Sequence, residues 1–581
     1  MILEHIQSPA DVKKLSLGEL KNLATEARKA LFTKLYKHGG HCGPNFGFVE
    51  ATIALHYVFT TPEDKIVYDV SHQSYIHKML TGRAAAFLDE HKYDDVTGYT
   101  NPDESQHDFF NIGHTSTAVS LALGLATARD LQGQSGSVVA IIGDGSLSGG
   151  EAFEALSNAG EYAKNFIIVV NDNEMSIAEN HGGLYEGLRL LRHTQGEGTH
   201  NFFRSLNLDY IYVEQGNDLA TLIQTFQNVK DHPRPIVVHL HTDKGHGFDR
   251  AEQNKEEWHY TAPFNPETGE KAQLPFETYG EVTYQILSDI FKEDPKAVAI
   301  TAGVPSLGGF TAERRKAAGR QFIDVGIAEE HGVALASGLA KGGAHPIFMT
   351  ASTFMQRTYD QIAQDLCINR NPAVLLSLFA GYEGMNDITH LCFFDIAMMG
   401  SIPGLTVLEP TCKEEYEAML RWAMAQEQQP VALRTAFVAT SRPGTYDTTY
   451  ATPRYSLDKQ GQQVAIIALG SFYSLGQQTS DMLQAQGIDA TLINPRFASA
   501  VDVEMLERLK ADHQLVITLE NGVLDGGFGE RIARFYGDST MKVRNYGLPK
   551  MLIDRYDRTA FAQENRLTPA LITEDIVNIL G

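Results

Sequence analysis

The chain has few residues of the kinds that mark disulfide-rich, zinc-binding or membrane proteins. Only four of its 581 residues are cysteine, and these lie far apart without CxxC spacing, so neither a zinc site nor a disulfide framework is expected. No apolar run reaches membrane-spanning length. The N-terminus also lacks a basic segment followed by an apolar core, the pattern of a secretory leader. We therefore expect a cytoplasmic protein with no membrane partner.

Basic residues are outnumbered by acidic ones. The 48 Lys and Arg residues against 72 Asp and Glu give a formal net charge of −24, which argues against nucleic acid or an anionic membrane surface as a partner. The hydrophobic fraction of 43% and the charged fraction of 21% are ordinary for a globular protein. A chain of this length exceeds a single core, so several domains are expected.

Oxygen-bearing side chains follow two neighbouring apolar runs. The run Val138 to Ile142 is followed by Asp144, which has a glycine on each side, and the run Phe166 to Val170 is followed by Asn173. Three apolar residues between the runs have the spacing of one buried helix face: Phe153, Leu156 and Ala159. The stretch predicts a strand–helix–strand unit whose strand ends meet at one edge of a parallel sheet, where such sheets bind ligands.

The side chains at this edge favour a cation and a phosphate group. Asp144 and Asn173 would present a carboxylate and an amide oxygen to one point, and hard oxygen ligands suit Mg²⁺. Glycines 143 and 145 would let the backbone approach a diphosphate, whose charge the following helix start favours. A ligand-free turn is the alternative, since Gly-Asp-Gly alone is a common turn sequence.

Apolar patterns predict further elements along the chain. The expected helices span residues 49–59, 279–291, 333–340 and 475–486, and the expected strands span residues 65–70, 235–240, 297–301, 463–469, 490–494 and 515–520. Residues 1–40 are expected to form two short helices. Residues 178–208 mix glycine, histidine and charge, and we expect a mobile excursion there.

Several motifs resemble a known enzyme family. The Gly-Asp-Gly and Asn-Asp-Asn pair resembles the thiamine-diphosphate signature of transketolase-like enzymes. Residues 66–83, IVYDVSHQSYIHKMLTGR, are very close to a motif of the 1-deoxy-D-xylulose-5-phosphate synthases, and residues 113–116, GHTS, resemble their GHSS segment. The resemblance covers nearly the whole chain. It implies an α/β fold of three doubly wound sheet domains: a diphosphate-binding domain at 1–270, a pyrimidine-binding domain at 271–445 and a transketolase C-terminal-like domain at 446–581.

The same resemblance implies thiamine diphosphate and Mg²⁺ as cofactors. The metal ligands would be Asp144, Asn173 and the Met175 carbonyl. The residues that contact thiamine diphosphate would be His72, Gly113, His114, Thr115, Gly145, Ser146, Asn173, Lys244, Phe248, Glu329 and Phe354.

The family's catalytic carboxylate falls on Glu329. A carboxylate beside the aminopyrimidine promotes deprotonation of the thiazolium carbon, and burial would raise its pKa. Without the first motif, Glu329 and Glu330 would be interpreted as an acidic helix start favoured by the helix dipole. The resemblance adds Arg357 as a substrate contact, and four histidines would hold substrate and handle protons: His41, His72, His259 and His390.

The acceptor half of the site departs from the family pattern. Where the synthases have an Asp-Arg-Ala-Gly segment, this chain has Leu378-Phe379-Ala380-Gly381, and a second family arginine aligns with Phe437. A tyrosine and an aspartate of the family are replaced by Ala351 and Asn386. Losing a charged phosphate contact costs about 1.5–3 kcal/mol.

These observations predict a thiamine-diphosphate-dependent carboligase and a homodimer. It would decarboxylate pyruvate and transfer the two-carbon unit to an aldehyde such as glyceraldehyde 3-phosphate. One alternative is a transketolase-like enzyme with a different or unphosphorylated substrate. Another is a non-catalytic paralogue that only binds thiamine diphosphate, against which the retention of Glu329 argues.

Overall fold

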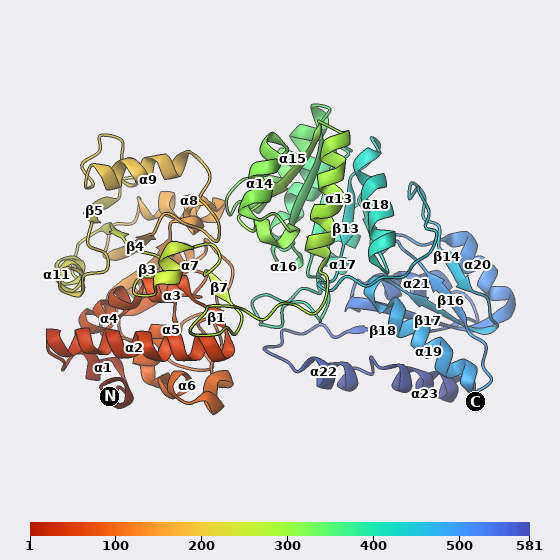
Figure 1. Ribbon diagram of the computed structural model, residues 1–581, viewed down its shortest axis with the longest axis horizontal. Helices are drawn as coiled ribbons and strands as arrows, with labels where there is room; N and C mark the ends of the chain where they lie inside the picture. Colours follow the sequence, from red (N-terminus) through yellow and green to blue (C-terminus); the bar gives the residue numbers. More distant parts are fainter. The chain divides into compact units, whose positions relative to one another are not determined.

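The computed structural model describes all 581 residues, and residue contacts divide it into two compact units. The first unit contains Met1–Gln273 and Gly326–Ala328, and the second contains Leu274–Val325 and Glu329–Gly581. Each unit is described by itself (Figure 1). None of the helices combines the length and apolarity that a bilayer crossing requires.

The first unit is built on a five-stranded, fully parallel sheet. Its strands, in spatial order, are β2 (Lys65–Tyr68), β3 (Val138–Gly143), β4 (Phe166–Asp172), β6 (Pro235–His241) and β5 (Asp209–Val213). A short antiparallel pair joins β1 (Gly40–His41) to β7 (Tyr260–Thr261). The helices are α1 (Pro9–Val12), α2 (Leu17–His38), α3 (Gly43–Gly47), α4 (Val49–Val58), α5 (Tyr75–Lys78), α6 (Ala85–Leu88), α7 (Ala118–Leu131), α8 (Gly150–Ala159), α9 (Gly183–His193), α10 (Phe202–Ser205), α11 (Leu219–Val229) and α12 (Asp249–Gln253).

Alternate strand residues enter two different cores. In β3, Val139 and Ile141 join a cluster with α2, α4 and α11. Ala140 and Ile142 join a second cluster with α7, α8 and α9. Because successive side chains of a strand point to opposite faces, this sheet is covered by helices on both sides.

The second unit holds two more sheets. The six-stranded one is parallel throughout, in the order β12 (Thr406–Leu408), β13 (Val431–Arg434), β11 (Val374–Leu378), β10 (His345–Ala351), β8 (Ala297–Thr301) and β9 (Phe322–Asp324). The five-stranded one has the order β14 (Ser456–Lys459), β16 (Thr491–Asn494), β15 (Gln463–Ala468), β17 (His513–Val523) and β18 (Lys542–Leu548), with only β14 antiparallel.

Helices cover both faces of these sheets too. They are α13 (Tyr279–Glu293), α14 (Ala312–Ala318), α15 (Glu329–Lys341), α16 (Ser352–Met355), α17 (Asp395–Gly400), α18 (Lys413–Ala425), α19 (Tyr473–Ala485), α20 (Val503–Asp512), α21 (Phe528–Tyr536), α22 (Arg558–Glu564) and α23 (Pro569–Leu580). Helices α13 and α18 cover one face of the six-stranded sheet, and α19 and α23 cover one face of the five-stranded sheet (Figure 1). The remaining faces of both sheets contribute to one shared cluster, which contains Ile300 of β8 and Ile467 of β15. The predicted α/β architecture of three helix-covered sheets is therefore confirmed.

Two predictions for the N-terminal half are wrong. Residues 1–40 do not form two short helices, because α2 runs unbroken for 22 residues. The Ser16 hydroxyl accepts from the Glu19 backbone while Glu19 binds the Ser16 backbone, a capping box that fixes the start of the helix. Phe153, predicted to be buried, is 39% exposed, and its ring edge meets Phe202 at 5.4 Å.

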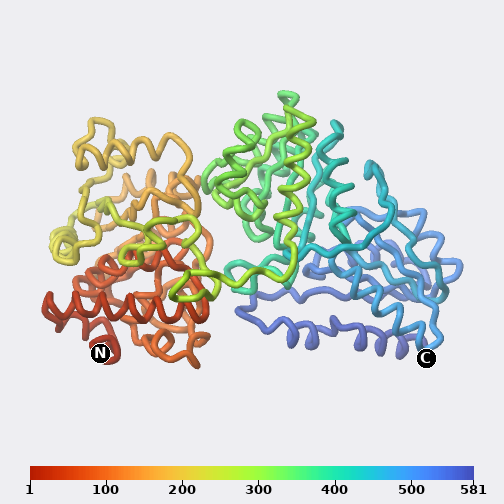
Figure 2. Tube along the Cα trace, in the orientation of Figure 1, coloured from red at the N-terminus to blue at the C-terminus, as the bar shows by residue number.

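Residues 178–208, predicted to be a mobile excursion, contain two helices, and their mobility stays a prediction. Figure 2 follows the chain from β4 through this segment and back to β5. The helix α9 buries Leu188 and Leu191 against the core shared with α7 and α8, while the short α10 buries Phe203. Two leucines three residues apart are enough to anchor one face of a helix, but the flanking glycines obscured that pattern.

One of the two expected domain boundaries lies close to the boundary between the compact units, and the other does not. The unit boundary at residues 273 and 274 lies close to the predicted one at 270. No division appears near 445, since both sheets of the second unit fall in one compact unit. The three-domain division therefore stays a prediction.

Candidate functional site

In the first unit, Asp144 and Asn173 lie at the ends of neighbouring strands. Gly143 pairs with Asn171 across β3 and β4, and the Asp144 backbone donates to the Asn171 carbonyl at 3.1 Å. The sequence thus predicted which two strand ends meet, and the structure places both side chains at that edge.

The oxygens here fit a divalent cation. Asp144 is 1% exposed, and burial, with the Asp172 carboxylate nearby, raises its pKa to about 8. The Asn173 Oδ1 atom is buried and has no hydrogen-bond partner, which is costly unless something else binds it. No cluster of three or more His, Cys, Asp or Glu residues is arranged to hold a metal. A set of one carboxylate, one amide and one carbonyl suits Mg²⁺, which fills its remaining positions with water and phosphate.

The chain turns sharply where the third predicted ligand lies. Glu174 has a φ of 66°, and Met175 forms an isolated antiparallel bridge with Glu179. Gly145 packs closely against this turn, because a Cβ on it would lie 3.0 Å from the Ser176 Cβ and would require Ser176 to shift. Ser146 lies buried directly after it.

Two lysines bring positive charge to the same edge. Lys244 is almost fully buried and its Nζ donates to the Ser176 carbonyl; burial lowers its pKa to about 7. Lys255, which the sequence did not single out, donates from Nζ to the Asn173 carbonyl at 3.4 Å. Both ammonium groups therefore reach the loop that carries Asn173, which suits a diphosphate.

The segment of Gly113, His114 and Thr115 leads into the N-terminus of α7. The backbone N–H groups of residues 116, 117 and 118 all donate to the Asp69 carboxylate, at 2.8, 2.8 and 2.9 Å. Asp69 therefore fixes this helix start, whose dipole favours negative charge. The sequence analysis missed Asp69, although its position at the end of β2 matches that of Asp144 at the end of β3.

Three of the four predicted histidines lie together. The ring centroids of His41 and His72 are 5.1 Å apart, those of His72 and His259 are 5.2 Å apart, and those of His41 and His259 are 5.9 Å apart. The pairing of β1 with β7 brings His41 to the 258–261 segment. Burial lowers the pKa of His259 well below its usual value, which favours the neutral ring, and its Nδ1 has no hydrogen-bond partner.

His72 follows a strained turn. Val70 and Ser71 have φ values of 57° and 64°, a region that non-glycine residues rarely adopt and that is especially costly for valine. The Ser71 hydroxyl donates to the Ile112 carbonyl at 2.6 Å and accepts from the Thr100 backbone at 2.8 Å. These contacts hold the left-handed turn that directs the chain from β2 into His72.

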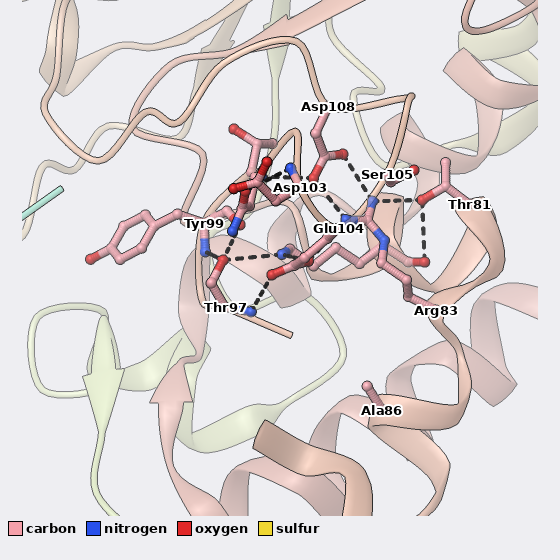
Figure 3. Close-up of polar contacts among 12 residues, drawn as sticks. Thr81, Arg83, Ala86, Thr97, Tyr99, Asp103, Glu104, Ser105 and Asp108 are labelled. Carbon is pink, nitrogen blue, oxygen red and sulfur yellow. Dashed lines mark hydrogen bonds and ion pairs between the residues drawn. The ribbon is translucent and has the colours of Figure 1, made fainter. Parts of the chain in front are cut away.

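A buried ionic network holds the segment 97–108 against the helical region that follows His72. Figure 3 shows the Arg83 guanidinium between two carboxylates, with bonds of 3.0 Å to Glu104 and of 2.7 and 2.9 Å to Asp108. Lys78 forms a further ion pair with Glu104 at 2.5 Å, and the Thr97 backbone donates to the same residue at 2.6 Å. The Arg83 and Lys78 pairs are at most 10% exposed.

This network positions Tyr99. The Thr97 hydroxyl donates to the Tyr99 carbonyl at 2.5 Å and accepts from its backbone N–H at 3.2 Å. The Tyr99 ring lies edge-on to His41, with centroids 5.6 Å apart. Tyr99 is therefore a neighbour of the histidine cluster that the sequence did not predict.

One predicted cofactor contact has a different environment. Phe248 packs among aromatic rings of the first core, with centroids 5.5 Å from Phe32, 5.4 Å from Phe46 and 5.1 Å from Trp258. This packing is compatible with a structural role of the partly buried ring, and its contact with the cofactor stays a prediction.

In the second unit, Glu329 is the first residue of α15 and is 2% exposed. Its Oε2 lies 3.7 Å from Arg357 Nη1 and makes no hydrogen bond. Burial raises the pKa of Glu329 to about 7, against the opposing effect of Arg357. This is the environment expected of a carboxyl group that exchanges a proton near neutral pH. Phe354 and His390 also lie together, edge to face at 5.7 Å.

The two phenylalanines that depart from the family pattern stack on each other. Phe379 directly follows β11 and Phe437 lies just beyond the neighbouring β13. Their ring centroids are 4.6 Å apart with planes inclined by 25°, and Phe276 meets Phe437 edge-on at 5.7 Å. Offset stacking is a favourable aromatic geometry, so apolar rings form a paired surface at these strand ends.

The buried arginine at the end of β13 forms ion pairs with other buried residues. Arg434, at the end of β13, forms ion pairs with Asp395 at 2.9 Å and Glu409 at 2.8 Å and donates to the Asn521 carbonyl at 2.6 Å. Asn521 also anchors the loop that leads to His390, because its Oδ1 accepts from the Tyr382 backbone at 3.0 Å. Arg434 therefore cannot replace the arginine that is missing at Phe437.

The fold and these residues define a thiamine-diphosphate-dependent transferase of the transketolase class. A model of 1-deoxy-D-xylulose-5-phosphate synthase matches residues 3–199, the pyrimidine binding domain of transketolase matches residues 278–436, and the transketolase C-terminal domain matches residues 454–572.

Relatives in three bacteria place the chain within that class. The 1-deoxy-D-xylulose-5-phosphate synthase of Symbiobacterium thermophilum is 37% identical, with 98% of this chain and 93% of the relative aligned. That of Heliobacterium modesticaldum is also 37% identical, over 98% and 94%, and that of Caldanaerobacter subterraneus is 35% identical, over 99% of each chain. The chain belongs to the 1-deoxy-D-xylulose-5-phosphate synthase family. A solved Campylobacter jejuni transketolase aligns at 15% identity over 97% of this chain and 100% of its own, with a TM-score of 0.45, so the assignment is based on the sequence relatives.

Proposed function

We propose that this protein decarboxylates pyruvate and transfers the resulting two-carbon unit to an aldehyde. The observation that carries the proposal is the buried Glu329 carboxyl group, whose pKa is raised to about 7. When bound, thiamine diphosphate supplies the carbon nucleophile that attacks the keto group and accommodates the electrons when CO₂ leaves. Glu329 would exchange a proton with the aminopyrimidine of this cofactor.

The other residues would bind the cofactor and the substrates. In the first unit, Asp144, Asn173 and the Met175 carbonyl would hold Mg²⁺ on the diphosphate, and Lys244 would neutralise part of the diphosphate charge. Phe354 would pack on the aminopyrimidine. In the first unit, the histidine cluster His41, His72 and His259 would bind or protonate substrate. In the second unit, His390 is a separate candidate for the same role.

The experiment is to measure CO₂ release from pyruvate with thiamine diphosphate and Mg²⁺, with and without an aldehyde acceptor. We expect release to require both cofactors and to be lost in Glu329→Ala. A wild-type protein that binds thiamine diphosphate but releases no CO₂ from pyruvate, and transfers nothing from ketose phosphates, would favour the non-catalytic paralogue instead.

A second candidate is the same chemistry with an unphosphorylated acceptor. The stacked pair Phe379 and Phe437 favours it, because two apolar rings offer no donor to a phosphate. Paired reactions with glyceraldehyde and glyceraldehyde 3-phosphate distinguish the two candidates by which aldehyde gives product. The homodimer and the cytoplasmic location are further proposals, which light scattering and cell fractionation would test.

A further inference from the structure

Asn180 connects the cation site to the segment that carries α9. Its Nδ2 donates to the Asp144 Oδ2 atom at 2.6 Å. The other end of the same amide, Oδ1, is buried and has no hydrogen-bond partner. Two amide oxygens beside one buried carboxylate, those of Asn173 and Asn180, are thus without partners. An unpaired buried acceptor costs free energy, and two at one carboxylate point to a ligand that would satisfy them.

The helix that follows Asn180 makes hydrogen bonds and an ion pair with residues at the same strand ends. The Tyr185 hydroxyl of α9 donates to the backbone carbonyls of Asp144 and Gly145, both at 3.2 Å. At the other end of the helix, Arg192 forms an ion pair with Asp172 at 2.5 Å. The helix itself is amphipathic, with only Leu188 and Leu191 fully buried. Its docking therefore depends strongly on polar contacts to the residues that flank the cation site.

We propose that Asn180 is a positioning residue of the cation site that links its occupancy to the docking of α9. Its Nδ2 orients the Asp144 carboxylate, and its Oδ1 accepts a hydrogen bond from a water molecule bound to the cation. This inference depends on the proposed function, because it needs Mg²⁺ and thiamine diphosphate to bind at this edge.

The chemistry of the amide supports this division of roles. Mg²⁺ retains water in several of its positions, and these waters are strong hydrogen-bond donors. Partners of metal-binding carboxylates commonly fix their orientation, and removing such a partner lowers metal affinity by roughly 10- to 100-fold. The Asn180 Nδ2 atom donates to the Asp144 carboxylate, and its Oδ1 atom remains available to accept from a second group. A residue that only bound the carboxylate would not need this second group.

The test measures Mg²⁺ binding and proteolysis, without measuring turnover. Wild-type protein and Asn180→Ala are titrated with Mg²⁺ at saturating thiamine diphosphate by calorimetry. We expect the Mg²⁺ dissociation constant to rise by about 10- to 100-fold in the variant. Trypsin cleavage after Arg189, which lies exposed on α9, should slow when Mg²⁺ and thiamine diphosphate bind to the wild-type protein. At the same Mg²⁺ concentration it should not slow in the variant.

Raising the Mg²⁺ concentration about 100-fold should restore protection in Asn180→Ala, because mass action offsets the weaker affinity. Glu186→Ala, on the exposed face of the same helix, is the matched control and should leave the dissociation constant unchanged. A Mg²⁺ dissociation constant of the variant within twofold of the wild-type value overturns the proposal. So does a wild-type cleavage rate that is the same with and without Mg²⁺ and thiamine diphosphate. Failure of high Mg²⁺ to protect the variant from trypsin would overturn it as well. If the wild-type protein binds no thiamine diphosphate with Mg²⁺, the proposed function itself fails.

Discussion

Arg357 Nη1 lies 3.7 Å from Glu329 Oε2, yet that oxygen accepts no hydrogen bond. The distance is too long for the strong bidentate pairing that holds a carboxylate ionised. Burial therefore dominates over the arginine and raises the pKa of Glu329 to about 7. This balance leaves a carboxyl group that can both accept and release a proton near neutral pH.

Replacing Glu329 with glutamine should abolish most CO₂ release while preserving the fold. Removing a positioned proton-transfer group typically lowers the rate by about 10²- to 10⁴-fold. Steady-state CO₂ release from pyruvate measures the effect, and calorimetric binding of thiamine diphosphate serves as the control. A variant that retains wild-type turnover would remove Glu329 from the chemistry.

The same substitution should stabilise the cofactor-free protein at neutral pH. The carboxyl pKa is raised from 4.5 to about 7 by folding, so the folded protein keeps a proton that the unfolded chain releases. The stability of the wild type should therefore fall as pH rises through this window, by roughly 3 kcal/mol relative to Glu329→Gln. Urea unfolding of both proteins at pH 5 and pH 8 measures the difference. If the wild type gains stability over the variant between these values, the buried environment is wrong.

Arg83→Met should be strongly destabilising. The substitution leaves Glu104 and Asp108 buried with one cation fewer, and breaking a buried ion pair on one side costs about 3–5 kcal/mol. Urea unfolding at pH 7 tests this. The matched control is Arg189→Met, since Arg189 pairs with Glu186 at the surface, where the expected change is about 0–1 kcal/mol. Equal losses of unfolding free energy in the two variants would contradict the ionic network shown in Figure 3.

Lys244→Met should weaken thiamine diphosphate binding by about 10- to 100-fold, the value of a lost charge-assisted contact to phosphate. Lys255→Met should weaken it less, because Lys255 is half-buried rather than buried and its charge is more strongly screened by water. The control is Lys164→Met, which changes an exposed lysine paired with Asp130 at 3.9 Å. Calorimetric titration with thiamine diphosphate at fixed Mg²⁺ ranks the three variants. An unchanged affinity in Lys244→Met would show that this lysine only stabilises the loop at Ser176.

Phe437→Arg should shift acceptor preference toward phosphorylated aldehydes. A guanidinium at this position adds a phosphate contact worth about 10- to 100-fold in relative kcat/KM. Competition between glyceraldehyde and glyceraldehyde 3-phosphate measures the ratio, with Phe437→Leu as the control that keeps the position apolar. Identical ratios in all three proteins would place this ring outside the acceptor contacts.

The sequence predicted the strands well because they are continuous apolar runs, as buried parallel strands are. The strand at Ala297–Thr301 has the predicted limits, and the predicted helix at 279 begins at that residue. The proximity of Asp144 and Asn173 could also be predicted, because the carboxyl ends of adjacent parallel strands lie at the same edge of a sheet.

What the sequence did not specify are contacts between side chains that are distant along the chain. Arg83 meets Asp108 across 25 residues, and Asn180 meets Asp144 across 36. Charge and amide content alone cannot say which of many candidates pair. The packing of Phe248 could not be predicted for a related reason, because an aromatic residue near a motif can equally contact the core.

The hydrophobic cluster shared by the six- and five-stranded sheets has a consequence for shortened chains. Ile300 from one sheet and Ile467 from the other are both fully buried in it. Ending the chain at residue 445 would remove 13 of the 31 buried residues of this cluster and expose to water the apolar side chains that they cover. Such a fragment would be prone to self-association, so the C-terminal 136 residues (446–581) also bury apolar side chains of the part of the chain that precedes them.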